Sequence, residues 1–382
     1  MDTPTGPSIA ASADPNTNSL VVDDPLSNPY NSLNSLCNDL SNLQDLACRG
    51  AWRTILDKIA RARSLSLLTK PHEHLIYLTF NLLGLVKLRR FNDAYNELQS
   101  HIEDSNDGDD DDNPLNSPQY HYQTYPHHYP DQKGSMVPFA LRWLYAHLPS
   151  TVGHRQLALD RFYALLDFVR EKRRNHDGKS GDLWQKREVF VVNSIVSYHL
   201  SAKEFKVCVD LLRGLVSEDE FGVDSVLLSK LGYMQMQYGD LEGAKRTFGE
   251  VEKLVRENGN NEEVPLSNLV RRNKALLYLV GKDYVSAVRE YDECIERDGQ
   301  DVIAINNKAL CLMYLRDLTD SIKVLENALE RVPTVALNET LVVNLCSMYE
   351  LAYVNHADIK RTLSNWIARV APDDFDSSST RT

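Results

Sequence analysis

Three adjacent residues, Gly178, Lys179 and Ser180, could bind a phosphate, because they resemble the end of a nucleotide-binding loop. In such a loop an upstream glycine lets the backbone N–H groups surround the phosphates, and the lysine neutralises their charge. That glycine would have to lie at position 173, which is Arg173, and no strand pattern precedes it. The residues therefore do not predict a nucleotide site.

Two groups of residues have side chains that bind metal ions elsewhere. The acidic run Asp104–Asp112 offers carboxylate oxygens, but a calcium loop that begins at Asp104 needs glycine at its sixth position, where Asp109 stands. Three histidines follow among tyrosines, with no cysteine or carboxylate pair to complete a zinc or copper site: His121, His127 and His128. We predict a solvated acidic segment and no metal site.

One candidate for nucleophilic catalysis is the pair His199 and Cys208, which falls in a single predicted helical hairpin. A catalytic pair needs a third residue that orients the base, and Cys208 lies on the apolar side of its helix. Nor does a pair of carboxylates lie at a strand end or in a loop, where acid–base catalysis would need it. We therefore predict a protein that is not an enzyme and that has no cofactor.

The charge of the chain is concentrated in two segments. The 382 residues include 42 Lys and Arg and 54 Asp and Glu, for a net charge of -12. Residues 1–50 hold six acids and one base, and residues 101–133 hold eight acids and one base, so these segments account for the whole excess. Because nucleic-acid binding needs a basic face, the neutral remainder argues against a nucleic-acid partner.

The sequence also gives an expectation about the cellular compartment. The longest apolar candidate, residues 75–88, is interrupted by polar side chains, so we expect no membrane-spanning helix. The first ten residues lack the basic and apolar segments of a secretory signal. The six cysteines form no CxxC pair, and four of them fall in apolar helical patterns: Cys208, Cys294, Cys311 and Cys346. We predict a soluble, reduced, cytosolic protein.

Composition divides the chain into five segments. Residues 1–35 are rich in Pro, Ser, Asn and Asp, so we expect them to be disordered. Residues 36–102 should form N-terminal helical hairpins, and residues 103–133 an acidic, Tyr- and His-rich disordered loop. Residues 134–370 would form the main helical body, followed by a disordered tail over residues 371–382. Deleting the loop should then leave helical content and melting unchanged.

An internal repeat predicts the fold. Apolar residues recur at intervals of three and four, which indicates amphipathic helices. The sequence NKAL at Asn273–Leu276 recurs 34 residues later at Asn307–Leu310, and the second copy ends at Pro333. This is the spacing of a tetratricopeptide repeat. We predict an all-α, right-handed α-solenoid of five to seven such hairpins; the alternative is an irregular all-helical domain.

Residue size at the repeat positions has a physical reason. Small residues such as Ala275 and Ala287 let the two helices of a hairpin approach closely, while Tyr291 fills the gap to the next hairpin. An upstream copy, offset by 43 residues because of an insertion, has Gly232 and Phe248 at the corresponding positions. The repeat signal therefore extends beyond the two most similar copies.

A solenoid presents a concave face made by the first helix of each hairpin. Six polar residues would lie on that face and could satisfy the backbone of a bound peptide: Arg272, Asn273, Asn306, Asn307, Lys308 and Asn344. They could equally be ordinary solvated helix positions. Leu276 and Leu310 stand where a clamp for a chaperone C-terminus would need asparagine, which argues against that ligand.

The segment Glu339–Leu351, with the sequence ETLVVNLCSMYEL, is more specific than the repeat. It resembles the C-terminal part of the family of subunit 12 of the trafficking protein particle (TRAPP) complex. The preceding run, Asn307–Pro333, resembles the same region, and the resemblance extends over about residues 50–370. It implies a non-enzymatic subunit with a helical-repeat body.

The resemblance implies a place in a multisubunit vesicle-tethering complex that activates Rab GTPases in traffic from the endoplasmic reticulum through the Golgi, and in autophagy. The expected partners are the core subunits and the large accessory subunits 8 and 11, with membrane contact only through the complex. The expected location is cytoplasmic, peripheral to Golgi and early secretory membranes. The alternatives are a coat-complex subunit, a co-chaperone on the same fold, or a helical-repeat enzyme subunit.

Overall fold

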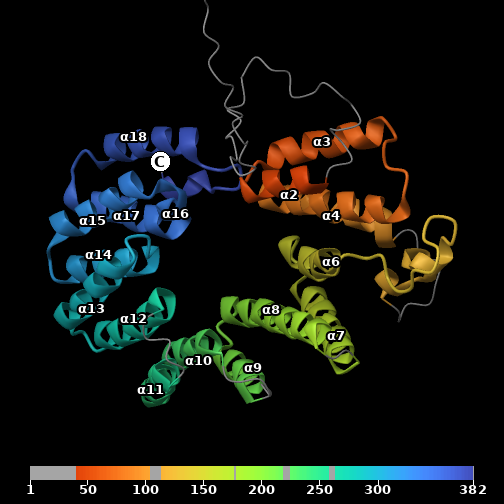
Figure 1. Cartoon of the computed structure of the whole chain (residues 1–382). Coiled ribbons are helices and arrows are strands. Elements are labelled where there is room, and N and C mark those ends of the chain that lie inside the picture. The colour runs from red at the N-terminus through yellow and green to blue at the C-terminus, as the bar shows by residue number, and fades with distance from the viewer. Residues whose placement is uncertain (1–39, 104–112, 176–177, 218–223, 258–262, 382) are drawn as a thin grey trace, which may run out of the picture.

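A computed structural model of the chain describes residues 40–103, 113–175, 178–217, 224–257 and 263–381. These residues form successive helices that curve around a central opening (Figure 1). The predicted all-α solenoid is therefore confirmed, while the predicted disordered segment 1–35 lies outside the described residues. The α-helices are α2 (Leu40–Cys48), α3 (Trp52–Ser64), α4 (Pro71–Lys87), α5 (Phe91–Leu98), α6 (Phe139–Thr151), α7 (Arg155–Arg174), α8 (Lys179–Ser201), α9 (Phe205–Ser217), α10 (Ser225–Tyr238), α11 (Leu241–Glu257), α12 (Val264–Val280), α13 (Tyr284–Arg297), α14 (Val302–Tyr314), α15 (Leu318–Arg331), α16 (Pro333–Ala336), α17 (Glu339–Ala352) and α18 (His356–Val370).

Seven helical hairpins follow one another: α4/α5, α6/α7, α8/α9, α10/α11, α12/α13, α14/α15 and α17/α18. The 34-residue repeat is visible in the helix bounds, because α15 begins and ends 34 residues after α13. A further pair, α2 and α3, precedes the first hairpin. The first helices α10 and α12 face the central opening, and the second helices α11 and α13 lie outside them (Figure 1).

The turn inside each hairpin is fixed by local chemistry. Gly239 ends α10 in the left-handed conformation, with a φ of 94° that favours glycine. Asp240 then accepts the backbone N–H of Gly243 at 2.8 Å, which satisfies a free donor at the start of α11. Asp283 caps α13 through Ser286, and Asp317 caps α15 through Asp320. A recurring aspartate therefore begins the second helices α11, α13 and α15.

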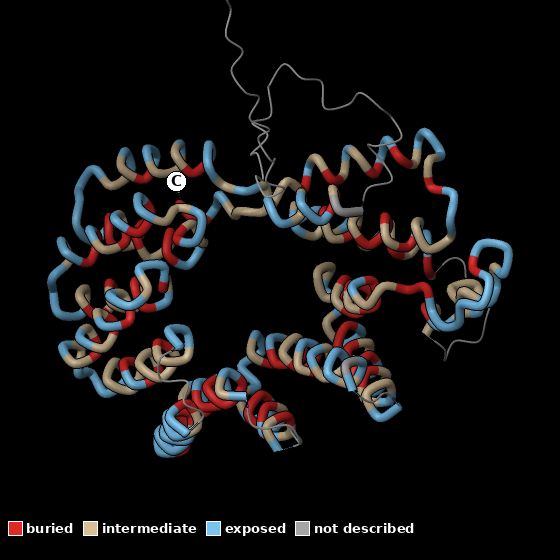
Figure 2. The backbone as a smooth tube through the Cα atoms, viewed as in Figure 1, coloured by how far each residue is buried: buried red, intermediate tan, exposed pale blue. Residues whose placement is uncertain are grey.

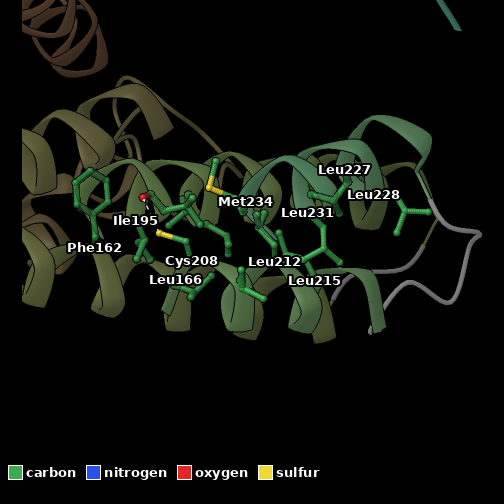
Figure 3. Packing of buried hydrophobic residues seen from close by; sticks show 14 of the residues in the cluster. Phe162, Leu166, Ile195, Cys208, Leu212, Leu215, Leu227, Leu228, Leu231 and Met234 are labelled. Carbon is green, nitrogen blue, oxygen red and sulfur yellow. Dashed lines mark hydrogen bonds between the residues drawn. The ribbon is translucent and has the colours of Figure 1, made fainter. Parts of the chain in front are cut away.

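The core is built in series, with the apolar side chains of each hairpin packed against the next. Figure 3 shows the largest cluster, where α7, α8, α9 and α10 bring together side chains such as Phe162, Ile195 and Leu231. Close approach needs small residues, because a Cβ atom at Gly232 would lie 2.5 Å from the ring of Phe248 on α11. Buried residues gather where neighbouring helices face one another (Figure 2).

Residues 113–133 are ordered, so the prediction of a disordered loop is wrong for this part of 103–133. A π-helical turn, η1 (Gln99–Glu103), precedes the segment, and three short 3-10 turns lie within it: η2 (Pro114–Asn116), η3 (Pro118–Tyr120) and η4 (Tyr122–Thr124). Leu115 is completely buried against α4–α6 side chains. The guanidinium of Arg142 donates to Asn116 Oδ1 at 2.8 Å. The acidic run Asp104–Asp112 lies outside the described residues.

The predicted disordered tail is also ordered over residues 371–381. Ala371 and Phe375 pack against side chains of α17 and α18. A 3-10 turn, η6 (Ser377–Thr380), follows, and the Lys360 ammonium donates to the carbonyl oxygen of Arg381 at 2.7 Å. This segment therefore belongs to the C-terminal part of the solenoid.

Because the Leu115 side chain is completely buried, Leu115→Ala should lower the free energy of unfolding of the N-terminal hairpins by about 2 kcal/mol or more. The change removes buried methyl groups and leaves a cavity beneath the segment. Gln123→Ala is the control, because Gln123 is exposed in the same segment. Urea unfolding followed by circular dichroism measures both, and equal stabilities for the two variants would show that the segment contributes no packing.

Candidate partner-binding surface

The six polar residues predicted to form a partner-binding face lie on the first helices α12, α14 and α17. The structure connects most of them to one another or to neighbouring hairpins. Asn273 on α12 is buried, and its Oδ1 accepts the hydroxyl of Ser229 on α10 at 2.8 Å. Since a buried hydrogen bond joins two successive first helices, Asn273 holds one hairpin against the next.

Three asparagines form a half-buried chain of amides between α14 and α17. The Asn344 amide nitrogen donates to Asn306 Oδ1 at 2.8 Å, and Asn306 in turn donates to Asn307 Oδ1 at 3.3 Å. Asn307 donates to the hydroxyl of the buried Tyr291 at 3.4 Å. These amides keep unused hydrogen-bonding capacity, because each amide has two donors and two acceptor lone pairs. The arrangement can therefore pair with the backbone of a bound segment.

Most basic residues of the first helices pair with acids from the second helices and the turns. Lys230 instead donates to Asn193 Oδ1 at 3.4 Å. The first helices α10, α12 and α14 contain five basic residues and no acid: Lys230, Arg271, Arg272, Lys274 and Lys308. Arg272 contacts both oxygens of the buried Asp301 at 2.9 Å, and Lys308 lies 2.5 Å from Asp292. The Lys274 ammonium donates to the Glu290 carboxylate, and this hydrogen bond raises the pKa of Lys274. The pairs orient the cations, so the face is polar without a large unpaired charge.

A second surface on the first helices was not predicted from the sequence. Phe139 and Trp143 on α6 meet Phe190 on α8, with ring centroids 6.3 and 5.8 Å from Phe190. Arg187 stacks over the Phe139 ring at 4.9 Å. Phe190 is 49% exposed. Phe139, Trp143 and His147 are four residues apart in sequence, and this spacing indicates an aromatic face on one helix. Partly exposed aromatic rings beside an arginine are typical of protein interfaces.

The candidate catalytic pair does not meet in the structure. His199 Nδ1 lies 2.5 Å from Glu204 Oε2, and its Nε2 lies 3.0 Å from the hydroxyl of Tyr163. The buried thiol of Cys208 instead donates to the carbonyl oxygen of Val196 at 3.5 Å, and burial raises its pKa. A raised pKa keeps the thiol protonated, so Cys208 is a poor nucleophile. Its role is core packing.

The other candidate residues are scattered. Gly178 precedes α8, and Lys179 and Ser180 are its first residues, after another helix and not after a strand. His127 and His128 are exposed, whereas the backbone of His121 pairs with Ser135. Across the described parts of the chain, His, Cys, Asp and Glu side chains form no cluster of three that could hold a metal ion. Within these same parts, no helix is long and apolar enough to cross a bilayer.

Comparison with known proteins finds two relatives with one name. Trafficking protein particle complex subunit 12 of Mus musculus is 31% identical over 282 residues, which is 68% of this chain and 34% of the mouse protein. The Homo sapiens subunit 12 is 29% identical over 362 residues, which is 87% of this chain and 46% of the human protein. The chain thus spans less than half the length of these relatives. No family model matches it.

Solved structures that resemble the chain include helical-repeat proteins. A tetratricopeptide repeat protein from Parabacteroides merdae is 12% identical, with a TM-score of 0.42, over 86% of this chain and 96% of the other. The C-terminal part of a repeat protein from Cytophaga hutchinsonii is 12% identical, with a TM-score of 0.40, over 80% of this chain and 99% of the other. Because these scores are low, the repeat assignment rests on the chain's own helices. The matches to the mouse and human proteins confirm the resemblance predicted from the C-terminal residues, and over the matched region the chain is similar to trafficking protein particle complex subunit 12.

Proposed function

We propose that this chain is a non-enzymatic accessory subunit that scaffolds a trafficking protein particle complex. The observation that carries the proposal is its relationship to subunit 12 over most of its length, on a solenoid with a long inner surface. A solenoid contacts several partners at once because each hairpin offers its own face. The half-buried amides of Asn306, Asn307 and Asn344 would pair with a partner's backbone, and Arg272, Asn273 and Lys308 would position them.

The proposal extends to partners and location. The partners would be the core subunits and the large accessory subunits 8 and 11 of the complex, with no nucleic acid. Rab activation, in traffic from the endoplasmic reticulum through the Golgi and in autophagy, would belong to the assembled complex, with exchange carried out by the core. The chain would be cytoplasmic and reach Golgi and early secretory membranes only through the complex.

The test is affinity purification of the tagged chain from its own cells, followed by cross-linking mass spectrometry. We expect stoichiometric recovery of core and large subunits, with cross-links to the inner helices. Recovery of coat proteins or chaperones alone would overturn the proposal.

A pair of variants tests the inner face. Asn306→Asp combined with Asn344→Asp should remove the cross-links to α14 and α17, because two adjacent carboxylates repel each other and lack amide donors. Asn327→Asp on the exposed side of α15 is the matched control. If the double variant keeps the same cross-links as the control, the partner does not use these amides.

A further inference from the structure

The two ends of the solenoid meet at the segment 371–376, which has the sequence APDDFD and which we name the closing segment. The backbone N–H of Asp373 donates to the carbonyl oxygen of Gly50 at 3.1 Å. The Asp373 carboxylate accepts the backbone N–H of Arg53 at 3.0 Å. Arg53 lies in the first turn of α3, whose own N-cap residue, Ala51, has no side chain that can cap the helix. Asp373 therefore supplies a missing helix cap from the opposite end of the solenoid.

Three charge pairs cross the same boundary. Asp373 lies 3.7 Å from Arg53 on α3, and Asp374 lies 2.9 Å from Lys87 at the end of α4. Asp376 lies 3.1 Å from Arg89 in the turn after α4. Each acid of the closing segment thus has its own basic partner on the N-terminal side. All three basic side chains are about half exposed or more, so water and salt reach every pair.

Two apolar residues of the closing segment face the C-terminal hairpin. Ala371 and Phe375 pack with Val342, Cys346 and Ile367 of α17 and α18. The backbone N–H of Asp376 donates to Glu339 at the start of α17 at 3.3 Å. Different side chains of the segment therefore contact the two ends of the solenoid. Ala371 and Phe375 attach the segment to the C-terminal hairpin. The acidic residues, and Pro372 beside Gly50, contact the N-terminal side.

Behind this boundary the two ends are separated by a cavity of about 1490 Å³. Residues of both ends line it, including Trp52 on α3, Leu337 after α16 and Trp366 on α18. The space is far larger than the voids of a packed core, so little apolar contact holds the ends together here. Closure then depends on exposed ion pairs, one helix cap and the backbone hydrogen bond from Asp373 to Gly50. Each exposed ion pair contributes little to the free energy of closure, and its attraction weakens as salt screens the charges.

We propose that the closing segment is a reversible electrostatic clasp. It joins the α2–α4 end of the solenoid to the α17–α18 end, and it opens along the line of the three ion pairs. On opening, the segment stays with α18, the start of α3 loses its cap, and the Trp52 and Trp366 sides of the cavity move apart. A binding partner that places its own charges on Arg53, Lys87 or Arg89 would shift the solenoid from closed to open. The inference does not depend on the proposed function.

Pulsed electron spin resonance on the full chain tests the clasp. Spin labels on Ser64→Cys in α3 and Asn365→Cys in α18, both exposed positions, report the distance across the boundary, with Cys37 and Cys48 changed to serine. Combining Asp373→Asn, Asp374→Asn and Asp376→Asn should lower the ratio of closed to open molecules by about tenfold. In the chain with an unmutated closing segment, 1 M salt should likewise shift the measured distances from the closed toward the open value.

The matched control removes three exposed acids that pair within single helices, through Glu242→Gln, Asp320→Asn and Asp358→Asn. It should leave the distance distribution unchanged. A charge exchange, Lys87→Asp with Asp374→Lys, should restore closure lost in Asp374→Lys alone, which distinguishes loss of the pair from misfolding. The clasp is disproved if the triple variant and 1 M salt both leave the closed distance intact, or if the control opens the boundary equally.

Discussion

Replacing Tyr291 by alanine should lower the free energy of unfolding of the C-terminal repeats by about 3–5 kcal/mol. Tyr291 on α13 is completely buried, in a cluster with Ala275, Ala287 and Cys311. Truncation removes the aromatic ring from the junction between two hairpins, and the small neighbours cannot move far enough to fill the cavity. Asn307 would also lose its contact with the Tyr291 hydroxyl. Burial of that hydroxyl raises its pKa, which keeps it protonated.

The control is Tyr291→Phe, which keeps the ring and removes only the oxygen. Because the lost hydrogen bond is long, at 3.4 Å, this variant should lose about 1 kcal/mol or less. Native-state hydrogen exchange is the suitable measurement, since a solenoid can unfold hairpin by hairpin. Amides of α12–α14 should lose protection in Tyr291→Ala while those of α6–α9 keep theirs. Comparable losses for the two variants would place the stabilisation in the hydroxyl and not in the ring.

The repeating part of the fold could be predicted from the sequence because its determinants are local and recur. Ala275 and Ala287 are completely buried at the contacts between helices, as their small size predicted. Gly232 meets the ring of Phe248, also in line with the repeat pattern. In each case the spacing of the helices and the sizes of the residues predict the same contact between helices. A hairpin needs only its own residues and those of its neighbours, so a single sequence is sufficient.

The two incorrect predictions concern segments that are ordered by distant residues. Composition made 113–133 appear disordered, yet Leu115 packs against helices on both sides of it in the chain, and Arg142 binds its backbone and side chains. Residues 371–376 are acidic and short, but their partners lie on α3 and α4, more than 280 residues away. Low hydrophobicity indicates that a segment cannot fold alone. It does not indicate whether a preformed surface will order it.

The candidate face was only partly predictable for a related reason. Helical periodicity places Asn306, Asn307 and Asn344 on first helices, and the structure agrees. It could not show that Asn273 would be buried beside Ser229, or that Arg272 would pair with Asp301. Such pairings depend on the exact stagger between hairpins, which a repeat pattern does not specify. That these residues bind a partner stays a prediction.

Replacing the two arginines that pair with Glu188 should lower the free energy of unfolding about as much as Tyr291→Ala does. Glu188 on α8 is completely buried, and its two oxygens accept from Arg170 Nε and from Arg173, both at 2.7 Å. Arg170→Ala with Arg173→Ala leaves this carboxylate without either pairing, and breaking a buried ion pair in this way costs about 3–5 kcal/mol. Thermal and urea unfolding should both show the α7–α9 region melting first.

The sharper expectation is that a third substitution restores stability. Adding Glu188→Leu to the double variant removes the uncompensated charge and fills the space with apolar atoms, and such replacements of buried ion pairs are often neutral or stabilising. The triple variant should therefore be more stable than the double variant by most of the original loss. Glu188→Leu alone should lower the free energy of unfolding less than the double variant does, because water can solvate the partly exposed Arg170 and Arg173 side chains. A triple variant no more stable than the double would mean that the arginines act through their aliphatic packing and not through the carboxylate.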